Sequence, residues 1–154
     1  MPPEFYPMPS FPTLAVADLT VSSRWYQEVL GFHFIFAMPE NNRQTSLVHL
    51  RWANYADLLL VPDRTAETKP KGIGITLTFA MFEGDIADFA QQIKMKGANI
   101  VGNPITRPWN VRELTVLDPD GYQLIFTQRI DPQMTLEQVI HQVTQTTATT
   151  TQTS

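Results

Sequence analysis

Hydrophobic and polar residues alternate along several short segments of the chain, a pattern typical of strands with one buried face. Segments 11–16, 47–61, 74–79 and 113–127 show it most clearly. Two other stretches repeat apolar residues at helical spacing. The first spans 22–30 and stops at Gly31; the second spans 85–96 and stops at Gly97. The pattern predicts strands and helices that alternate along a single chain.

The predicted elements occur in the same order twice. Segment 11–16 matches 74–79, each is followed by one of the helices, and segment 47–61 runs without gaps against 113–127. This internal repeat predicts two βαβββ modules, at 11–61 and 74–127. We therefore expect an α+β fold in which the two modules form a curved mixed β-sheet with the helices on its convex side.

The two ends of the chain differ from the middle. Residues 1–10 are rich in proline, which favours an extended arm. Residues 131–144 begin with Asp-Pro and place apolar residues at 136, 139, 140 and 143, so they predict an amphipathic helix that packs on the domain or on a partner. Residues 145–154 are polar and of low complexity, and we expect a disordered tail.

Composition narrows the classes of function. With 154 residues, of which 43% are hydrophobic, the chain is long enough for one domain with a sizeable core. It has no cysteine, which excludes disulfides, thiolate metal sites and a cysteine nucleophile. The net charge of −4 and the lack of a basic stripe argue against nucleic acid as a partner. Since no apolar run is long enough to cross a bilayer, we expect no membrane partner and a cytoplasmic protein.

Strand alternation also predicts which side chains line a groove, because successive side chains point to opposite faces of a sheet. One face of every strand is large and apolar and should lie under the helices. The opposite face is mixed in character and predicts a binding groove for a small organic ligand. Nine residues are predicted to line it: Phe11, Thr13, Leu47, His49, Leu59, Thr76, Trp109, Glu113 and Ile125.

Two motifs in these modules resemble a known superfamily. The first is VADLTVSSRWYQEVLGF at 16–32 and the second is RPWNVRELTVLDPDGYQLIF at 107–126. Together they resemble the vicinal-oxygen-chelate superfamily, which includes glyoxalase I, bleomycin resistance proteins and extradiol dioxygenases. The resemblance covers about residues 11–128 and implies the glyoxalase/bleomycin resistance fold. One departure is Asn110, which stands where the family has glycine; asparagine tolerates a left-handed backbone nearly as well.

The resemblance also implies where a metal would bind. Members that use a metal place a histidine near the start of each module's first strand and a glutamate in each module's last strand. The corresponding residues here are Phe11, Gly74, Leu59 and Ile125. None of them carries an imidazole or carboxylate, the groups that hold divalent ions. We therefore predict no metal and no other cofactor, with a divalent metal bound by other residues as the alternative.

His49 and Glu113 are the candidate catalytic residues. Both point into the predicted groove, and a His–Glu pair is able to act as a general base and the group that orients it. Against this, a lone histidine on a strand is more often a hydrogen-bonded structural residue than a metal ligand. The sequence leaves open whether the protein is an enzyme.

The resemblance favours a function in binding. Bleomycin resistance proteins are metal-free members that bind a drug without modifying it, and they exchange an N-terminal arm between subunits. We therefore expect a homodimer that sequesters a small, antibiotic-like molecule in grooves built from both chains. The alternatives are a lyase, isomerase or dioxygenase that uses His49 and Glu113, or a regulatory protein whose groove faces a peptide.

Overall fold

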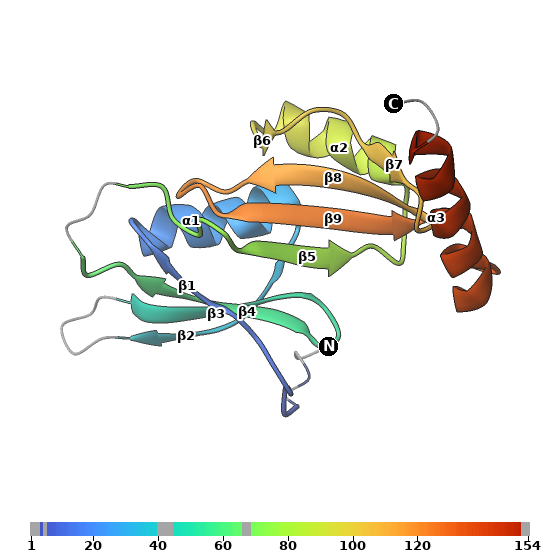
Figure 1. Ribbon diagram of the computed structural model, residues 1–154. Coiled ribbons are helices and arrows are strands. Elements are labelled where there is room, and N and C mark those ends of the chain that lie inside the picture. The colour runs from blue at the N-terminus through green and yellow to red at the C-terminus, as the bar shows by residue number, and fades with distance from the viewer. Residues whose placement is uncertain (1–3, 5, 40–44, 66–68, 152–154) are drawn as a thin grey trace.

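The computed structural model describes residues 4, 6–39, 45–65 and 69–151 (Figure 1). The first module contains β1 (Thr13–Val16), α1 (Leu19–Trp25), the π-helical turn η1 (Tyr26–Leu30), β2 (His33–Pro39), β3 (Thr45–Ala53) and β4 (Ala56–Pro62). The second contains β5 (Thr76–Ala80), α2 (Ile86–Met95), β6 (Asn99–Ile100), β7 (Ile105–Arg107), β8 (Val111–Leu117) and β9 (Gln123–Arg129). The helix α3 (Leu136–Thr151) follows.

The strands form two mixed sheets. The first has the order β1-β4-β3-β2, and the second has the order β5-β9-β8-β6, with β7 also paired to β8. In each sheet the first strand of the module runs parallel to the last, while the hairpins are antiparallel. The predicted α+β class and the two modules are confirmed. The sheet is not continuous, however, because β1 and β5 are edge strands of separate sheets.

Local sequence signals explain where the two module helices begin and end. The Asp18 carboxylate accepts a hydrogen bond from the amide of Val21 at 2.9 Å and caps α1, which therefore begins three residues earlier than 22. Asp85 caps α2 in the same way. Gly31 and Gly97 follow the helices with φ of 87° and 88°, a left-handed conformation that glycine adopts without strain.

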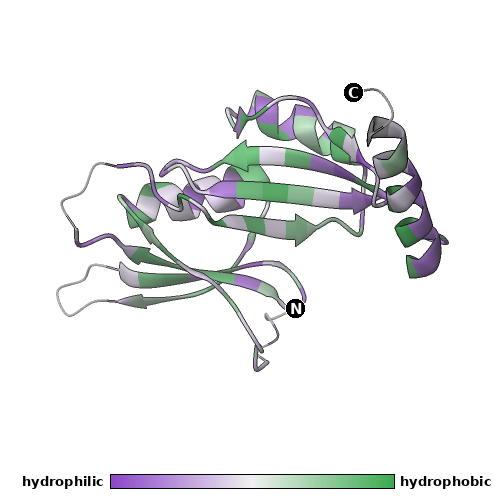
Figure 2. Cartoon of the chain, viewed as in Figure 1, coloured by the Kyte–Doolittle hydropathy of each residue, from purple (hydrophilic) through white to green (hydrophobic). Residues whose placement is uncertain are grey.

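The apolar faces of the two sheets share one core with the helices. Along β8 and β9, hydrophobic and hydrophilic residues alternate visibly (Figure 2). Side chains from both modules form this single cluster, including Leu14, Val16, Leu50, Leu58, Leu60, Phe79, Leu114, Val116, Leu124 and Phe126. Since these inner faces point toward the common core, the other face of each sheet points away from it.

The corner Asp118–Gly121 joins the second module to the first. The buried hydroxyl of Tyr26 donates to Asp118 Oδ2 at 2.8 Å, and the amide of Ala17 donates to Asp120 Oδ1 at 2.8 Å. The hydroxyl of Tyr122 donates to the carbonyl oxygen of Ala15 at 2.9 Å. These bonds span about a hundred residues of sequence and fix the two modules against each other.

The C-terminal prediction requires a correction. The helix was expected at 131–144 with a disordered tail at 145–154, but α3 runs from Leu136 to Thr151; residues 152–154 lie outside the described part. Thr135 and Gln138 form a reciprocal capping box, so the helix starts after them. Threonine hydroxyls in the predicted tail, such as that of Thr149, donate to carbonyl oxygens one turn earlier.

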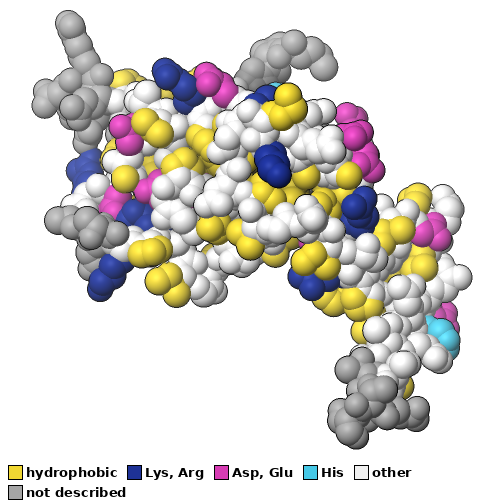
Figure 3. All heavy atoms as spheres, turned by 90° about the horizontal axis from the view of Figure 1, so that it is seen from above, with side chains coloured by type: hydrophobic (Ala, Val, Ile, Leu, Met, Phe, Trp, Pro, Cys, Tyr) yellow, Lys and Arg dark blue, Asp and Glu magenta, His cyan; other side chains and the backbone are white. Residues whose placement is uncertain are grey.

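The helix α3 stands away from the two modules (Figures 1 and 3). Its apolar side chains Leu136 and Ile140 are 74% and 57% exposed, so these two do not pack on the domain, whereas Val139 and Val143 are partly buried. No helix in the described residues has the length and apolar character to cross a membrane.

Candidate functional site

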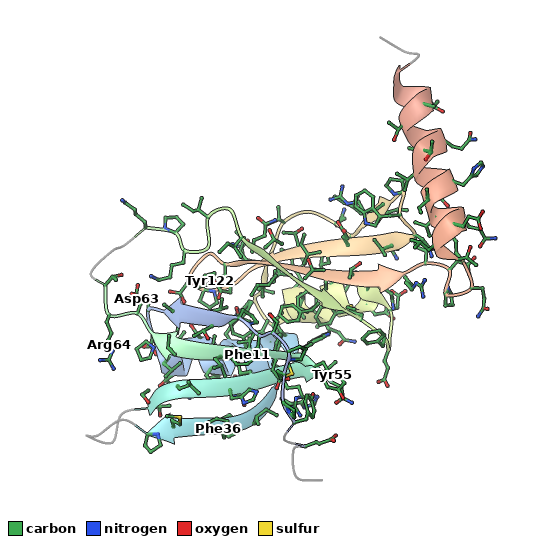
Figure 4. All side chains as sticks on the ribbon, turned by 60° about the horizontal axis from the view of Figure 1, so that its bottom comes forward. Phe11, Phe36, Tyr55, Asp63, Arg64 and Tyr122 are labelled. Carbon is green, nitrogen blue, oxygen red and sulfur yellow. The ribbon has the colours of Figure 1, made fainter. Side chains whose placement is uncertain are left out.

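The nine predicted groove residues are divided between the modules, and seven of them lie in strands, while Phe11 precedes β1 and Trp109 lies in the turn between β7 and β8. Five belong to the first module: Phe11, Thr13, Leu47, His49 and Leu59. The other four belong to the second: Thr76, Trp109, Glu113 and Ile125. We call the faces that point away from the core the outer faces. The outer face of the four-stranded sheet, with Phe11 and Phe36, is turned forward in Figure 4.

On the first module the outer face is arranged in cross-strand rows. Thr13 of β1 pairs with Leu59 of β4, which pairs with His49 of β3. His49 in turn pairs with Phe36 of β2, and the two rings meet edge to face with centroids 5.2 Å apart. The row therefore combines a hydroxyl, an aliphatic chain and two rings, while Phe11 beside it is 47% exposed.

His49 belongs to a buried polar network. Its Nε2 lies 2.7 Å from Asp57 Oδ2, and Arg51 binds the same carboxylate in a bidentate manner, with Nε 2.7 Å from Oδ1 and a terminal nitrogen 2.8 Å from Oδ2. The three residues are between 3% and 9% exposed. Buried charges are tolerated when they are paired in this way. Asp57 is therefore the centre that orients the imidazole and neutralises the guanidinium.

The network shifts the pKa of its charged members. Burial alone would raise the pKa of Asp57, but the hydrogen bonds from Arg51 and His49 outweigh it and lower that pKa below its ordinary value of 3.8. The hydrogen bond from Asp57 raises the pKa of Arg51. Both shifts favour the ionised forms, so the pair stays charged at neutral pH.

Part of the N-terminal arm covers this network. The carbonyl oxygen of Glu4 accepts a hydrogen bond from Arg51 at 2.7 Å, and the guanidinium lies 4.3 Å from the ring centroid of Tyr6. The hydroxyl of Tyr6 accepts from the amide of Tyr55 at 2.8 Å. The described arm residues thus bind the β3–β4 hairpin of their own chain.

A second polar group lies on the outer face of the second module. The Nε of Arg107 donates to Glu113 Oε2 at 2.7 Å, and its guanidinium lies 5.6 Å from the ring centroid of Trp109. Trp109 is 46% exposed, so about half of its surface is open to solvent. Nearby, Thr78, Ile125 and Thr115 form a cross-strand row of two hydroxyls and one aliphatic chain.

The structure does not pair His49 with Glu113, as the catalytic prediction supposed. Each has another partner, Asp57 for His49 and Arg107 for Glu113. The alternation of side chains along a strand identified the sheet face on which each residue lies. It did not identify which residue of the neighbouring strand each side chain contacts. The missed residue Arg51 had a usable signal, because it and Asp57 are opposite charges close to the two sides of the turn at 54–55. A register shift between Arg51 and Ala53 brings the two residues opposite each other.

The four positions that correspond to the superfamily's metal ligands carry no side chain able to bind a metal. Phe11, Leu59, Gly74 and Ile125 offer no nitrogen or oxygen side-chain ligand at the places where metal-using relatives hold an ion. Among the described residues, no three His, Asp or Glu side chains are grouped so that they would hold a metal. The acidic and imidazole groups of the outer faces are already bonded to arginines and to each other. These residues do not fit a divalent ion.

Three clefts occur elsewhere on the described surface. One lies between the modules at η1, the β3–β4 hairpin and α2; one lies between α1 and β2; one lies beside the 118–121 corner. None of the three is lined by any of the nine predicted groove residues. None of these three clefts therefore joins the two outer faces within a single chain.

Paired βαβββ modules with the Asp-Pro-Asp-Gly corner before the last strand define the class of protein. The family model of the Glyoxalase/Bleomycin resistance protein/Dioxygenase superfamily matches residues 10–126. The chain belongs to this superfamily. Asn110 supports the resemblance locally, because it adopts a φ of 65° where the family has glycine.

Solved structures share this fold at low sequence identity. TioX from Micromonospora sp. ML1 is 20% identical, with a TM-score of 0.62, over 82% of this chain and 98% of that one. TnmS3, an antibiotic binding protein from Streptomyces sp. CB03234, is 22% identical, with a TM-score of 0.61, over 77% and 93%. A glyoxalase/bleomycin resistance protein/dioxygenase from Nocardioides is 18% identical, with a TM-score of 0.63, over 84% and 88%. No curated protein matches the sequence.

Proposed function

We propose that this protein binds a small organic molecule of the antibiotic type and acts by sequestering it, without a metal. The observation that carries the proposal is the character of the outer faces. They expose aromatic, aliphatic and threonine side chains, while the positions of the superfamily's metal ligands hold Phe11, Leu59, Gly74 and Ile125. Apolar surface with a few fixed polar groups is typical of binding sites for small organic molecules. The antibiotic binding protein TnmS3, which shares the fold, supports this choice of ligand class.

We further propose that each binding groove is shared by two chains of a homodimer. The inner faces of both sheets pack into one core, so the outer faces of one chain do not face each other. A second copy is able to bring its second module opposite the first module of its partner. The described arm residues, which contact Arg51 and Tyr55, lie beside the same face.

The decisive experiment is a complementation test. Thr13→Trp blocks the outer face of the first module, and Thr76→Trp blocks that of the second; both threonines are exposed. Each variant is expected to lose the thermal shift that a glycopeptide or aromatic antibiotic produces in the unaltered protein, because ligands raise stability only where they bind the folded state. Gln91→Trp, at an exposed position on α2, is the matched control.

Mixing the two blocked variants distinguishes a shared groove from an internal one. If subunits exchange freely, half of the dimers are mixed and one of their two grooves is free of both tryptophans, so about a quarter of the binding capacity returns. No recovery, together with a monomer in analytical ultracentrifugation at micromolar concentration, contradicts the shared groove. Retained binding by both blocked variants contradicts the outer faces as the site.

An enzyme that uses His49, with or without a metal, is the second candidate, and the His49–Asp57 contact of 2.7 Å is the observation that favours it. A carboxylate that orients an imidazole is a common arrangement in general base catalysis. Elemental analysis of protein purified without chelators separates the two candidates. A stoichiometric transition metal that disappears in His49→Ala overturns sequestration, whereas its absence together with antibiotic binding supports it.

A further inference from the structure

A cleft of about 680 Å³ lies between the two modules, away from the outer faces. One wall comes from the end of η1 and the β3–β4 hairpin of the first module. The other comes from the β5–α2 loop and from α2 of the second module. Sites for drug-sized ligands have volumes of about 300–1,000 Å³ and often lie where two domains or modules meet. The cleft is therefore large enough for a ligand of its own.

The floor of this cleft is aromatic and held in place. The Nε1 of Trp52 donates to the carbonyl oxygen of Ala80 at 2.8 Å, which fixes the indole across the boundary between the modules. Its ring also lies 5.8 Å from that of Phe89 and 5.0 Å from that of Phe126. A ring that is immobilised before binding loses little conformational freedom when a ligand arrives.

The loop at the rim of the cleft is anchored at both ends. The amide of Met81 donates to the carbonyl oxygen of Thr127 at 2.8 Å, and the side chain of Gln128 bonds both Gly84 and Ile86. Between these anchors, the side chain of Phe82 is 83% exposed. Solvent-exposed rings at the mouth of a cavity gain burial when a ligand enters.

The rim carries an excess of negative charge. Glu83, Asp85 and Asp88 line it, against a single lysine, Lys96. Asp85 caps α2 through the amides of Ala87 and Asp88. Glu83 and Asp88 are exposed and, within the described part of the chain, take part in no ion pair. Carboxylates above an aromatic floor attract a cation, and tryptophan is the ring that binds cations best.

We propose that the cleft between the modules binds a compact aromatic organic cation. Its rings contact Trp52, Phe89 and Phe82, and its charge lies near Glu83 and Asp88. The site is separate from the outer faces and does not depend on their ligand.

Isothermal titration calorimetry at low ionic strength with two probes of the same shape tests the proposal. The unaltered protein is expected to bind one tetraphenylphosphonium cation per chain in the micromolar range and to bind the tetraphenylborate anion at least tenfold more weakly. Gln92→Trp places a large ring in the cleft and is expected to abolish cation binding. Gln91→Trp, its neighbour on α2, does not line the cleft and leaves binding unchanged.

Charge variants complete the test. Glu83→Gln combined with Asp88→Asn is expected to weaken cation binding about tenfold, in line with two weak ionic contacts at a partly exposed site. Glu28→Gln combined with Glu137→Gln makes the same change of net charge elsewhere and leaves affinity within about twofold. Equal binding of the two probes, or cation binding that survives Gln92→Trp, overturns the proposal. It also fails if Gln92→Trp alone converts a dimer into a monomer, since the cleft is then a subunit contact.

Discussion

The hydrogen bond between Tyr26 and Asp118 offers a quantitative test of how the two modules are held together. Tyr26 is fully buried, and its hydroxyl donates to a carboxylate that is 5% exposed. Burial, and then the neighbouring Asp118 charge, raise the pKa of Tyr26 well above 10, so the hydroxyl stays a donor at neutral pH. Tyr26→Phe removes the donor without changing the shape of the ring, and leaves a buried acceptor unsatisfied.

The expected cost follows from the kind of bond that is lost. Hydrogen bonds to charged groups contribute about 1.5–3 kcal/mol, against about 0.5–1.5 kcal/mol for bonds between neutral groups. We expect the free energy of unfolding to fall by about 2 kcal/mol, which lowers Tm by about 4–8 °C in a protein of this size. Tyr122→Phe, whose hydroxyl donates to the neutral carbonyl of Ala15, is expected to cost about 1 kcal/mol.

The penalty should also depend on pH. Burial raises the pKa of Asp118 above 3.8, and the hydrogen bond from Tyr26 opposes that rise. The variant therefore has a still higher Asp118 pKa and binds a proton more firmly when folded, so its deficit shrinks as the pH falls through that pKa. Urea unfolding at pH 7 and pH 4 measures both effects. Equal costs for Tyr26→Phe and Tyr122→Phe at pH 7, or a deficit that grows in acid, would refute this reasoning.

Three further predictions concern other parts of the chain. Asn110→Gly keeps a residue that accepts a positive φ but removes the two side-chain hydrogen bonds of Asn110 to the backbone of Asp131. Urea unfolding should show that the free energy of unfolding falls by about 1–2 kcal/mol, and an unchanged value would mean that these bonds contribute nothing. Asp57→Asn leaves the buried guanidinium of Arg51 without its counter-charge and should lower the free energy of unfolding by about 3 kcal/mol at pH 7. Because the pKa of Asp57 is lowered in the folded state, the stabilisation by its charge is present above pH 3.8 and is lost as the pH falls. A difference in urea unfolding that does not shrink in acid would contradict the charged pair. Gly72→Ala should lower Tm far more than Gly84→Ala. Both glycines have a positive φ, but only a Cβ at position 72 would lie 2.5 Å from the ring of Tyr122. Equal shifts of Tm in thermal melts of the two variants would show that the ring moves aside.

Much of the fold was predictable because hydrophobic periodicity and the internal repeat are local or pairwise features of the sequence. Alternation identified the buried faces, and the two repeats gave the order of the elements. Whether β1 and β5 pair was not predictable in this way, since it depends on how two finished modules pack. A C-terminal helix was predicted, but its extension through 145–151 was missed because polar composition suggested disorder. Its start was predicted too early because the capping box of Thr135 and Gln138 was not recognised.

The site was predictable only in part. The alternation of side chains along the strands placed His49 and Glu113 on the outer faces, which the sheet register supports. Their pairing with each other was an additional assumption, and each of them contacts a different residue. The register places Leu59 opposite His49 and Ile105 opposite Glu113. The actual partners, Asp57 and Arg107, lie two residues along the neighbouring strand and are reached diagonally. A search for opposite charges within three residues of each predicted turn would have found Arg51 and Asp57. Whether the nine residues line a shared groove stays a prediction.

The long-range bonds at the 118–121 corner have a consequence for how the chain is made. During synthesis the first module emerges before the residues that cover its inner face exist, because Asp118, Asp120 and Tyr122 lie about a hundred residues downstream of their partners. Contacts of such sequence separation form late and slow the folding rate. The nascent first half therefore exposes apolar surface at the ribosome until the second half has been translated.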